Sequence, residues 1–526
     1  MEKVEKIKRY IPCMLLISII YILIFLVSYD NLNKGDRVLS IETEKESFNI
    51  DTDVKKVQDQ IYLNIEEYNK VLDNNIYLDK ISRKVIYLTD NGIKKENIIS
   101  NKNVIYENSS LWISIKNIEE KFNKKTYYIK QTNTIIFEDR NFVEAKILKN
   151  NIEMYYTKQK DSIYNFRLNK DSKVYVLNIE ENSVNKYVHV VNKNGDKEYL
   201  GYILKGNLQY ILDVNKQQEK QDENKDVVIG ISENNVYSNV EGVNVIGIDS
   251  LQLTNPNGNI KISNRDKVII KAKENKKEVF AIIDNDFKAS NFTNDITSSM
   301  LNSDTNRENN INKILDYLKQ NKFSGIIVNY KRLKISDKQV YTQYIKELVT
   351  VMHANNLKVI VKSGLESYID TDNILKVVDS VILELYNERT TNSNTSGTHF
   401  KYDKLKNIIK EYKGKNIQDN IIIELPMYSI LWTERNGIVV DAQIYSSKLE
   451  QQYVLKNKIT ATKNESIKQK YFEYSKGRIM YKMWLEDEYS IKNKIDLVKE
   501  NKLKGISLYK LGYETKEIRE VISNEY

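Results

Sequence analysis

The stretch Gly325-Ile-Ile-Val-Asn-Tyr330 decides the fold of this 526-residue chain, because it is a short apolar run with a helical pattern on either side. In both flanks, apolar residues recur at the i, i+3, i+4, i+7 spacing of an amphipathic helix. The preceding stripe consists of Ile311, Ile314, Leu315 and Leu318, and the following one of Tyr341, Tyr344, Ile345 and Leu348. A buried strand between two helices is typical of βα units and a parallel sheet.

The same alternation continues from about residue 227 to residue 526. Further strands are predicted at Lys358-Val-Ile-Val361, Ser380-Val-Ile-Leu-Glu-Leu385, Ile421-Ile-Ile-Glu-Leu425 and Gly505-Ile-Ser-Leu-Tyr509. A third helical stripe contains Tyr402, Leu405, Ile408 and Ile409. About 300 residues of such units favour an α/β fold of the (β/α)8 barrel type over a shorter doubly wound sheet. In such a barrel, the functional side chains lie at the carboxyl ends of the strands.

Upstream of residue 227 the pattern is that of small β-rich modules. Residues 61–145 and 150–212 contain short alternating runs separated by turn residues, which is typical of strands. A polar stalk (residues 30–60) precedes the first module, and a charge-dense linker (residues 213–226) follows the second. The linker contains too few apolar residues to form a hydrophobic core, so we place a domain boundary there.

The segment from Ile11 to Tyr29 reads IPCMLLISIIYILIFLVSY and contains no charged residue. Its nineteen residues match the length needed for a helix to cross a bilayer. Basic residues in the tail (residues 1–10) favour a cytoplasmic N-terminus, so residues 30–526 are expected on the outer side. The alternative is a cleaved signal peptide, but no A-x-A-like site follows the apolar run.

Composition excludes several classes of function. Cys13 is the sole cysteine, which rules out intrachain disulfides and cysteine-based metal sites. The three histidines are far apart in sequence, so the composition offers little support for a Ser–His–Asp or Cys–His catalytic site. The net charge of +9 is spread over 81 basic and 72 acidic residues, so we expect no nucleic-acid partner. Asp284 and Asp286 alone are too few ligands for a metal, and no cofactor is predicted.

Several blocks of the C-terminal region resemble glycoside hydrolase family 18, and in particular its spore-germination and cortical-fragment-lytic branch. They stand in the family's order: Gly242-Val-Asn-Val-Ile-Gly-Ile-Asp-Ser-Leu-Gln-Leu253, Val279-Phe-Ala-Ile-Ile-Asp-Asn-Asp-Phe287, Leu425-Pro-Met-Tyr-Ser-Ile-Leu-Trp432, Met483-Trp-Leu-Glu-Asp-Glu-Tyr-Ser490 and Gly505-Ile-Ser-Leu-Tyr-Lys-Leu-Gly-Tyr513. The resemblance implies a barrel over residues 227–526 that acts on N-acetylglucosamine-containing glycans.

The upstream modules carry two weaker resemblances. Residues 107–137 are similar to the N-terminal domain of copper amine oxidases, although the histidines that copper chemistry requires are absent. Residues 173–203 resemble a bacterial SH3-like domain, with the Asn194-Gly195 turn followed by Gly201-Tyr-Ile203. The second resemblance implies a possible protein partner for this module.

The catalytic run of the family is not retained. Its pattern D-G-x-x-x-D-x-E falls on Ser324-Gly-Ile-Ile-Val-Asn-Tyr-Lys331, so Ser324 and Asn329 replace aspartates and Lys331 replaces the acid glutamate. In the family, the acetamido oxygen of the substrate attacks C1, an aspartate holds the resulting cation, and the glutamate protonates the leaving oxygen. A lysine with a usual pKa near 10.4 is a poor proton donor, and its charge opposes the cation that develops at C1.

A second replacement accompanies the first. The family's sixth strand ends in M-x-Y-D, whereas this chain has Glu384-Leu-Tyr-Asn387. Residues two apart share one face of a strand, so Glu384 should point inward with Tyr386. We predict an ion pair between Glu384 and Lys331 across the barrel mouth, so that neither charge is buried alone. By the same parity, Glu424 should join Tyr428.

Two interpretations follow. The first is a membrane-anchored barrel that binds cell-wall glycan (peptidoglycan, cortex or a chitin-like oligosaccharide) or a protein partner without turnover. The second is an active glycosidase that uses a relocated carboxylate such as Glu384, Glu486 or Asp487. An acidic pair such as Glu486 and Asp487 is, however, usually a solvated feature. The residues expected to line the glycan groove are Glu384, Tyr386, Asn387, Tyr428, Trp432, Trp484 and Tyr509. The expected location is the outer face of a bacterial membrane, in a vegetative or a sporulating cell.

Overall fold

A computed structural model describes residues 37–526, apart from 43–46, 58–59, 72–74, 80–81, 100, 130–133, 139–142, 156–163, 177–186, 195–196, 212–225, 286–292 and 416. The upstream strands and the C-terminal barrel belong to separate compact units.

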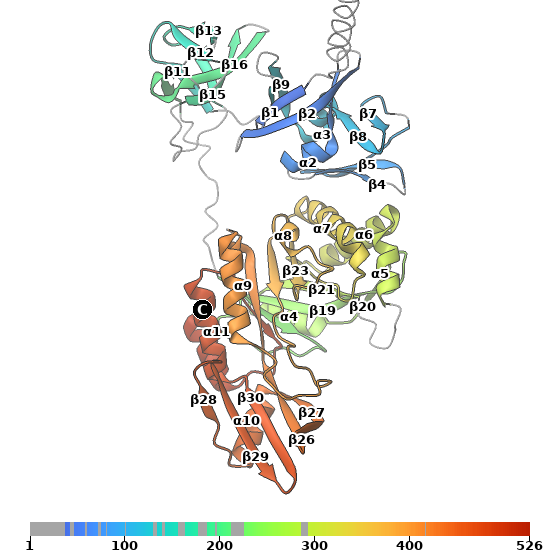
Figure 1. The fold of residues 1–526 in the computed structure, drawn as a ribbon, viewed down its shortest axis with the longest axis vertical. Coiled ribbons are helices and arrows are strands. Elements are labelled where there is room, and N and C mark those ends of the chain that lie inside the picture. Colours follow the sequence, from blue (N-terminus) through green and yellow to red (C-terminus); the bar gives the residue numbers. More distant parts are fainter. Residues whose placement is uncertain are drawn as a thin grey trace, which may run out of the picture. The chain divides into compact units, whose positions relative to one another are not determined.

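Eight parallel strands close into a barrel in the C-terminal unit (Figure 1). They are β18 (Val227–Ser232), β19 (Val245–Leu253), β21 (Glu278–Asp284), β22 (Gly325–Asn329), β23 (Lys358–Ser363), β24 (Ser380–Leu383), β25 (Ile421–Pro426) and β31 (Gly505–Tyr509). Each strand pairs with the next in this order, β31 pairs with β18, and the short β20 (Ile260–Ile262) is antiparallel to β19. The predicted (β/α)8 barrel is therefore confirmed.

Helices connect and cover the strands. They are α4 (Asp266–Glu274), α5 (Thr293–Leu301), α6 (Asp304–Gln320), α7 (Lys338–His353), α8 (Thr371–Leu375), α9 (Tyr402–Gly414), α11 (Glu488–Glu500) and α12 (Lys516–Glu525). The three predicted stripes fall on α6, α7 and α9. Side-chain caps begin several helices: Ser303 accepts a hydrogen bond from the backbone of α6, and Asp487 does the same for α11.

The barrel has two apolar cores, one on each face of its sheet. Apolar residues from most of the strands, mainly isoleucines, fill the interior: Ile229, Ile231, Val245, Phe280, Ile282, Ile327, Ile360, Ile382 and Ile422. The intervening positions, such as Ile326 and Val328, pack outward against the helices. This alternation with a period of two fixes which later residue of each strand points into the barrel mouth.

A five-stranded antiparallel sheet is inserted between β25 and α11 and was not expected from the sequence. It contains β26 (Tyr428–Arg435), β27 (Ile438–Ser446), β28 (Thr462–Asn464), β29 (Gln469–Lys476) and β30 (Ile479–Leu485), with α10 (Ser447–Lys456) packed against it. Two blocks read from the sequence as parts of the barrel therefore extend into this insertion.

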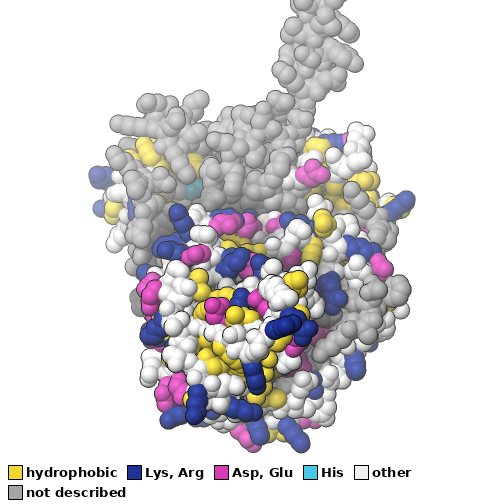
Figure 2. All heavy atoms as spheres, turned by 60° about the horizontal axis from the view of Figure 1, so that its bottom comes forward, with side chains coloured by type: hydrophobic (Ala, Val, Ile, Leu, Met, Phe, Trp, Pro, Cys, Tyr) yellow, Lys and Arg dark blue, Asp and Glu magenta, His cyan; other side chains and the backbone are white. Residues whose placement is uncertain are grey.

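The edge strand β27 of the insertion is unusually apolar on its exposed side. Ile438, Val440 and Ile444 are each more than half exposed, at 65%, 54% and 54%. Figure 2, in which the lower end of Figure 1 is brought forward, shows hydrophobic side chains gathered among lysine and arginine side chains.

The upstream region is rich in strands, as predicted. One seven-stranded sheet has the order β7-β8-β3-β2-β1-β10-β9, and β4-β5-β6 form a smaller sheet. Their bounds are β1 (Arg37–Glu42), β2 (Ser47–Val57), β3 (Gln60–Asn64), β4 (Ile76–Asp79), β5 (Lys84–Thr89), β6 (Gly92–Asn97), β7 (Val104–Glu107), β8 (Ser110–Ser114), β9 (Lys125–Ile129) and β10 (Thr134–Glu138), with helices α2 (Ile65–Val71) and α3 (Ile115–Phe122).

A second seven-stranded sheet follows, with the order β13-β12-β16-β15-β14-β11-β17. Its strands are β11 (Val143–Ile147), β12 (Ile152–Tyr155), β13 (Tyr164–Leu168), β14 (Lys173–Val176), β15 (Tyr187–Asn194), β16 (Lys197–Leu204) and β17 (Leu208–Tyr210). The resemblances of these two regions to an amine oxidase domain and an SH3-like domain, and the domain bounds drawn from sequence, stay predictions.

None of the described helices is long and apolar enough to span a membrane. The predicted anchor, residues 11–29, lies outside the described residues.

The buried ion pair between Arg307 of α6 and Glu347 of α7 makes the stability of the barrel testable. The guanidinium donates to both carboxylate oxygens at 2.9 and 3.0 Å, and the two residues are 2% and 3% exposed. Glu347→Gln would remove the negative charge that compensates this buried guanidinium, so we expect a loss of about 3–5 kcal/mol in the free energy of unfolding. Denaturant titration followed by intrinsic fluorescence measures this loss.

Lys415→Gln is the matched control, because the partners of Lys415, Glu411 and Asp372, are largely exposed. Its effect should stay below about 1 kcal/mol. Equal effects of the two substitutions would contradict the prediction.

Candidate functional site

The carboxyl end of the barrel carries charged side chains at positions set by the interior core. The residue two positions after an interior isoleucine also points inward. In four strands this residue is charged: Glu233 follows Ile231, Lys362 follows Ile360, Glu384 follows Ile382 and Glu424 follows Ile422. The same parity on β22 leads from Ile327 to Asn329 and then to Lys331.

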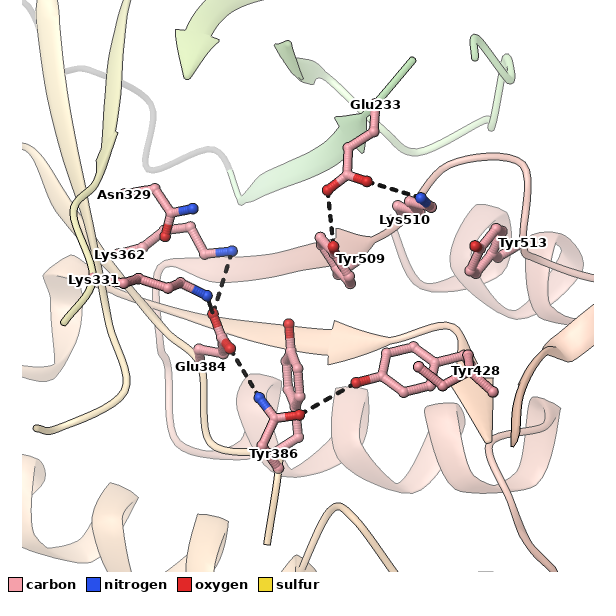
Figure 3. A pocket seen from close by; sticks show the side chains of 12 residues that line it. Glu233, Asn329, Lys331, Lys362, Glu384, Tyr386, Tyr428, Tyr509, Lys510 and Tyr513 are labelled. Carbon is pink, nitrogen blue, oxygen red and sulfur yellow. Dashed lines mark hydrogen bonds and ion pairs between the residues drawn. The ribbon is translucent and has the colours of Figure 1, made fainter. Parts of the chain in front are cut away.

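These side chains surround a cavity of about 400 Å³ (Figure 3). Its lining consists of Glu233, Asn329, Lys331, Lys362, Glu384, Tyr386, Asn387, Tyr428, Ile444, Tyr509, Lys510 and Tyr513. This volume lies within the range of small-ligand sites in proteins. Ile444 comes from the insertion, so the insertion supplies part of the cavity wall.

Lys331 and Glu384 form the ion pair that the sequence predicted. The ammonium of Lys331 donates to Oε2 of Glu384 at 2.9 Å. Asn387 donates its Nδ2 to the other oxygen of Glu384 at 3.0 Å. Glu384 and Tyr386 both line the cavity, which confirms their shared inward face.

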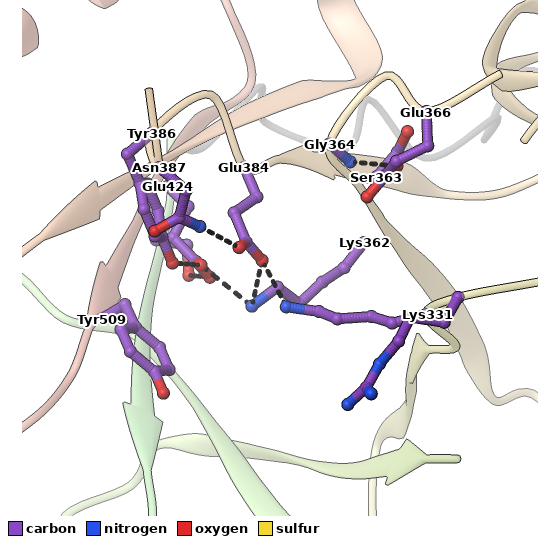
Figure 4. A network of polar contacts seen from close by, with 12 residues as sticks. Lys331, Lys362, Ser363, Gly364, Glu366, Glu384, Tyr386, Asn387, Glu424 and Tyr509 are labelled. Carbon is purple, nitrogen blue, oxygen red and sulfur yellow. Dashed lines mark hydrogen bonds and ion pairs between the residues drawn. The ribbon is translucent and has the colours of Figure 1, made fainter. Parts of the chain in front are cut away.

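A second lysine, which sequence reasoning missed, lies deeper between two carboxylates (Figure 4). Lys362 donates to Oε1 of Glu424 at 2.9 Å, and its ammonium is 3.6 Å from Oε2 of Glu384. Glu424 is fully buried and also accepts hydrogen bonds from the hydroxyls of Tyr386 and Ser507. The signal that could have identified Lys362 is its place two residues after Ile360.

A third pair, also missed, lies on the side of β18 and β31. Glu233 accepts a hydrogen bond from the hydroxyl of Tyr509 at 2.8 Å and another from the ammonium of Lys510 at 2.8 Å. The three glutamates of the mouth are thus matched by three lysines.

The ion pairs of the cavity keep Glu384, Lys362 and Glu233 in their charged forms. Burial alone would raise the pKa of Glu384, but the ammonium groups of Lys362 and Lys331 lower it below its usual value. Burial likewise disfavours the charged form of Lys362, yet Glu424 and Glu384 raise its pKa. The pKa of Glu233 is lowered by Lys510 and Tyr509 against the opposing effect of burial. None of these three groups is poised to exchange a proton near neutral pH.

The aromatic side chains predicted for the groove divide into two sets. Tyr386, Tyr428 and Tyr509 line the cavity, and the rings of Tyr386 and Tyr509 lie 6.4 Å apart at 29°. Trp432 does not: its indole is fully buried in β26 and donates to the backbone oxygen of Gly397 at 3.1 Å. Trp484 lies on β30 against Tyr471 and is not part of the lining either. Both tryptophans belong to the inserted sheet, so that sheet and not the barrel determines where they lie.

The motif position Ser324 also lies away from the cavity. It precedes β22 at the amino end of the strand, where its backbone pairs with Val279 and Lys358. Four residues of β22 separate it from Asn329, so only Asn329 and Lys331 of the motif reach the mouth.

Glu486 and Asp487 are buried, contrary to the expectation of a solvated pair. Glu486 is fully buried against Lys494 and accepts a hydrogen bond from Gln469 at 2.7 Å, while Asp487 caps α11 and contacts Lys470. Burial raises the pKa of both carboxyls. Neither residue lines the cavity.

No cluster of three or more potential metal ligands occurs within the part of the chain that the structure describes. Asp284 ends β21, and Asp286 lies outside the described residues.

Comparisons with known proteins identify relatives of this region. The family model described as "Glycosyl hydrolases family 18" matches residues 231–514. No protein with a curated description matches the chain. Among solved structures, the spore cortex-lytic enzyme SleL of Bacillus cereus has a TM-score of 0.51 at 16% identity and is similar over 57% of this chain and 74% of its own.

Two chitinases are similar over the same share of this chain. The chitinase of Chromobacterium violaceum has a TM-score of 0.51 at 17% identity, over 57% of this chain and 99% of its own. A mutant class V chitinase of Nicotiana tobaccum, solved in complex with NAG4, has a TM-score of 0.50 at 14% identity, over 57% and 99%. At such low sequence identities, the similarity to these solved structures establishes the fold alone.

His399, which stacks on Tyr428 behind the cavity at 4.8 Å, makes a prediction about acid stability. Burial, with a smaller effect of Lys494, lowers its pKa to about 3. An unfolded histidine titrates near 6.5, so between about pH 6.5 and 3 the unfolded chain binds a proton that the folded chain does not. Stability should therefore fall with decreasing pH by up to about 1.4 kcal/mol per unit, and His399→Phe should remove this slope.

The measurement is the difference in unfolding free energy between the original chain and His399→Phe across this pH range. His353→Gln is the control, and its effect on stability should have the opposite pH dependence, since Asp379 raises the pKa of His353. The stabilising effect of that pair is present below about pH 6.5 and is lost as the pH rises through the folded pKa. An unchanged acid slope in His399→Phe would contradict the assignment.

Proposed function

This chain belongs to glycosyl hydrolases family 18, and we propose that its barrel binds an N-acetylglucosamine-containing cell-wall glycan without hydrolysing it. The observation that carries the proposal is the ammonium of Lys331, held 2.9 Å from Glu384, at the position of the family's acid glutamate. The tyrosine rings of the cavity offer apolar faces to sugar rings, and the charged and amide groups suit hydroxyls and acetamido groups.

Hydrolysis by the family's mechanism needs a proton donor and a negative charge near C1. Lys331 stands in place of the glutamate acid and its charge opposes the developing cation, and Asn329 supplies an amide where a carboxylate would be needed. General acid help is typically worth about 10² to 10⁴ in rate, so its loss alone would leave little turnover.

The alternative, an active glycosidase with a relocated carboxylate, finds less support. Glu384 is in the cavity, but its lowered pKa makes it a carboxylate rather than a proton donor at neutral pH. Glu486 has a raised pKa, but neither it nor Asp487 lines the cavity. A replacement acid would have to reach the scissile oxygen within hydrogen-bond distance.

The test is to incubate the chain with peptidoglycan, cortex fragments and chitin oligomers and to score sedimented protein together with new reducing ends. We expect sedimentation without new ends. Tyr509→Leu should weaken binding by about threefold to tenfold because it removes a ring from the cavity. Trp484→Leu, which alters an aromatic residue outside the cavity, is the matched control and should bind normally.

Two outcomes would overturn the proposal. New reducing ends that persist in Lys331→Ala and disappear in Glu384→Gln would identify a relocated catalytic carboxylate. Failure to bind any of the glycans would point instead to a protein partner, for which the module predicted to be SH3-like is the first candidate.

We further propose that residues 11–29 anchor the chain in a bacterial membrane with residues 30–526 on the outer side, in a vegetative or a sporulating cell. The support is the uncharged apolar run and its basic N-terminal flank. In cells, the chain should resist carbonate extraction and be digested by protease added outside, whereas deletion of residues 11–29 should release it from the membrane fraction. A full-length chain in the soluble fraction would contradict anchoring.

A further inference from the structure

Asn329 offers an unused hydrogen-bonding group to a ligand. It ends β22 and lines the cavity. Its Oδ1 is buried and has no hydrogen-bond partner among the described residues. An unsatisfied buried acceptor is unfavourable, and a ligand N–H that donates to it would remove this cost. The side-chain amide also has two N–H donors, so it is complementary to an acetamido group.

Lys331 presents a positive charge beside this amide. An ammonium has three N–H donors, and the structure gives that of Lys331 one acceptor among the described residues, Glu384. The side chain of Lys331 is 38% exposed, whereas the side chains of Glu384 and Lys362 are 12% and 5% exposed. The charge that a ligand meets on this side of the cavity is therefore an ammonium, because the carboxylates behind it are covered.

The opposite side of the cavity does not offset this charge. Glu233 is paired with Lys510 at 2.8 Å, and Glu424, which is fully buried, is paired with Lys362 at 2.9 Å. Figure 3 shows Asn329 and Lys331 projecting into the cavity from the same side. Residues two apart on an extended segment are separated by roughly 7 Å, a distance that the long side chain of Lys331 can shorten.

We propose that the cavity prefers an N-acetylated amino sugar that carries a carboxylate, with Asn329 pairing with the acetamido group and Lys331 binding the carboxylate. N-acetylmuramic acid has both groups on neighbouring ring carbons and is a probe of this class. This inference rests on the proposed glycan binding and adds to it a preference between sugars. In this arrangement the lysine that replaces the acid acts as a specificity residue.

The experiment is calorimetric titration of the full chain, in detergent, with three disaccharides at low salt. The first is N-acetylglucosaminyl-β-1,4-N-acetylmuramic acid, the second is its methyl ester at the lactyl carboxylate, and the third is N,N′-diacetylchitobiose. We expect the first to bind about tenfold more tightly than the other two, since one charge-assisted hydrogen bond is of this order. The preference should weaken at high salt.

Variants assign the preference to residues. Lys331→Gln should abolish the tenfold difference, and Lys331→Arg, which keeps the charge, should retain most of it. Lys334→Gln is the matched control, because Lys334 lies three residues away with a 40% exposed side chain, pairs with Asp295 and does not line the cavity. Asn329→Leu should weaken all three disaccharides to a similar extent.

The outcomes separate this inference from the function on which it rests. Equal affinity of the original chain for the three disaccharides would overturn the preference and leave glycan binding intact. A preference that survives Lys331→Gln would overturn the role of Lys331. If no disaccharide binds to a chain that sediments with peptidoglycan, the preference between sugars is overturned and glycan binding stands; if the chain also fails to sediment, both proposals are overturned.

Discussion

The buried ammonium of Lys362 constrains the rest of the barrel mouth. It is 5% exposed and lies 2.9 Å from Glu424 and 3.6 Å from Glu384. A charge in a low-dielectric interior is tolerated only when partners satisfy it, and removing one partner leaves another charge unpaired. Glu424 is itself fully buried, so it needs Lys362 as much as Lys362 needs it. Lys362 lines the cavity, and Glu424 lies buried behind it.

The ion pair between Lys331 and Glu384 depends on the buried pair between Lys362 and Glu424. Glu384 contacts Lys362 but is shared with Lys331, which brings the ammonium of Lys331 to the mouth. The same two lysines that stabilise Glu384 as a carboxylate lower its pKa and remove it as a proton donor. An arrangement that satisfies buried charges is thus poorly suited to general acid catalysis, which needs a pKa near the working pH. It remains well suited to holding a polar ligand by fixed charges and amides.

The insertion shapes the site from the other side. Trp432 holds the loop after β24 through Gly397, and Gln469 of β29 links that loop, through Thr398, to the buried Glu486. His399, in the same loop, stacks behind Tyr428, and Ile444 of β27 reaches the cavity. Trp432 and Glu486, which the sequence offered as candidates for the site, therefore support the loop that holds His399 behind Tyr428.

The sequence by itself determined the barrel, its inward face and one ion pair. Periods of 3.6 and 2 are local properties of a chain, so the helical stripes, the strands and the inward direction of Glu384 and Lys331 could be read without coordinates. The lost acid at Lys331 could be read in the same way, from the motif. The parity argument also covered Lys362 and Glu233, but no motif marked them, and they were missed.

Only the tertiary structure decided which inward side chains meet and which aromatic residues do not. The closure of β31 onto β18 brings Lys510 to Glu233, which lies more than 270 residues earlier in the chain. The departure of the chain from β25 into an inserted sheet carries Trp432 and Trp484 away from the cavity and buries Glu486. Both outcomes depend on contacts between distant segments, which local periodicity does not encode.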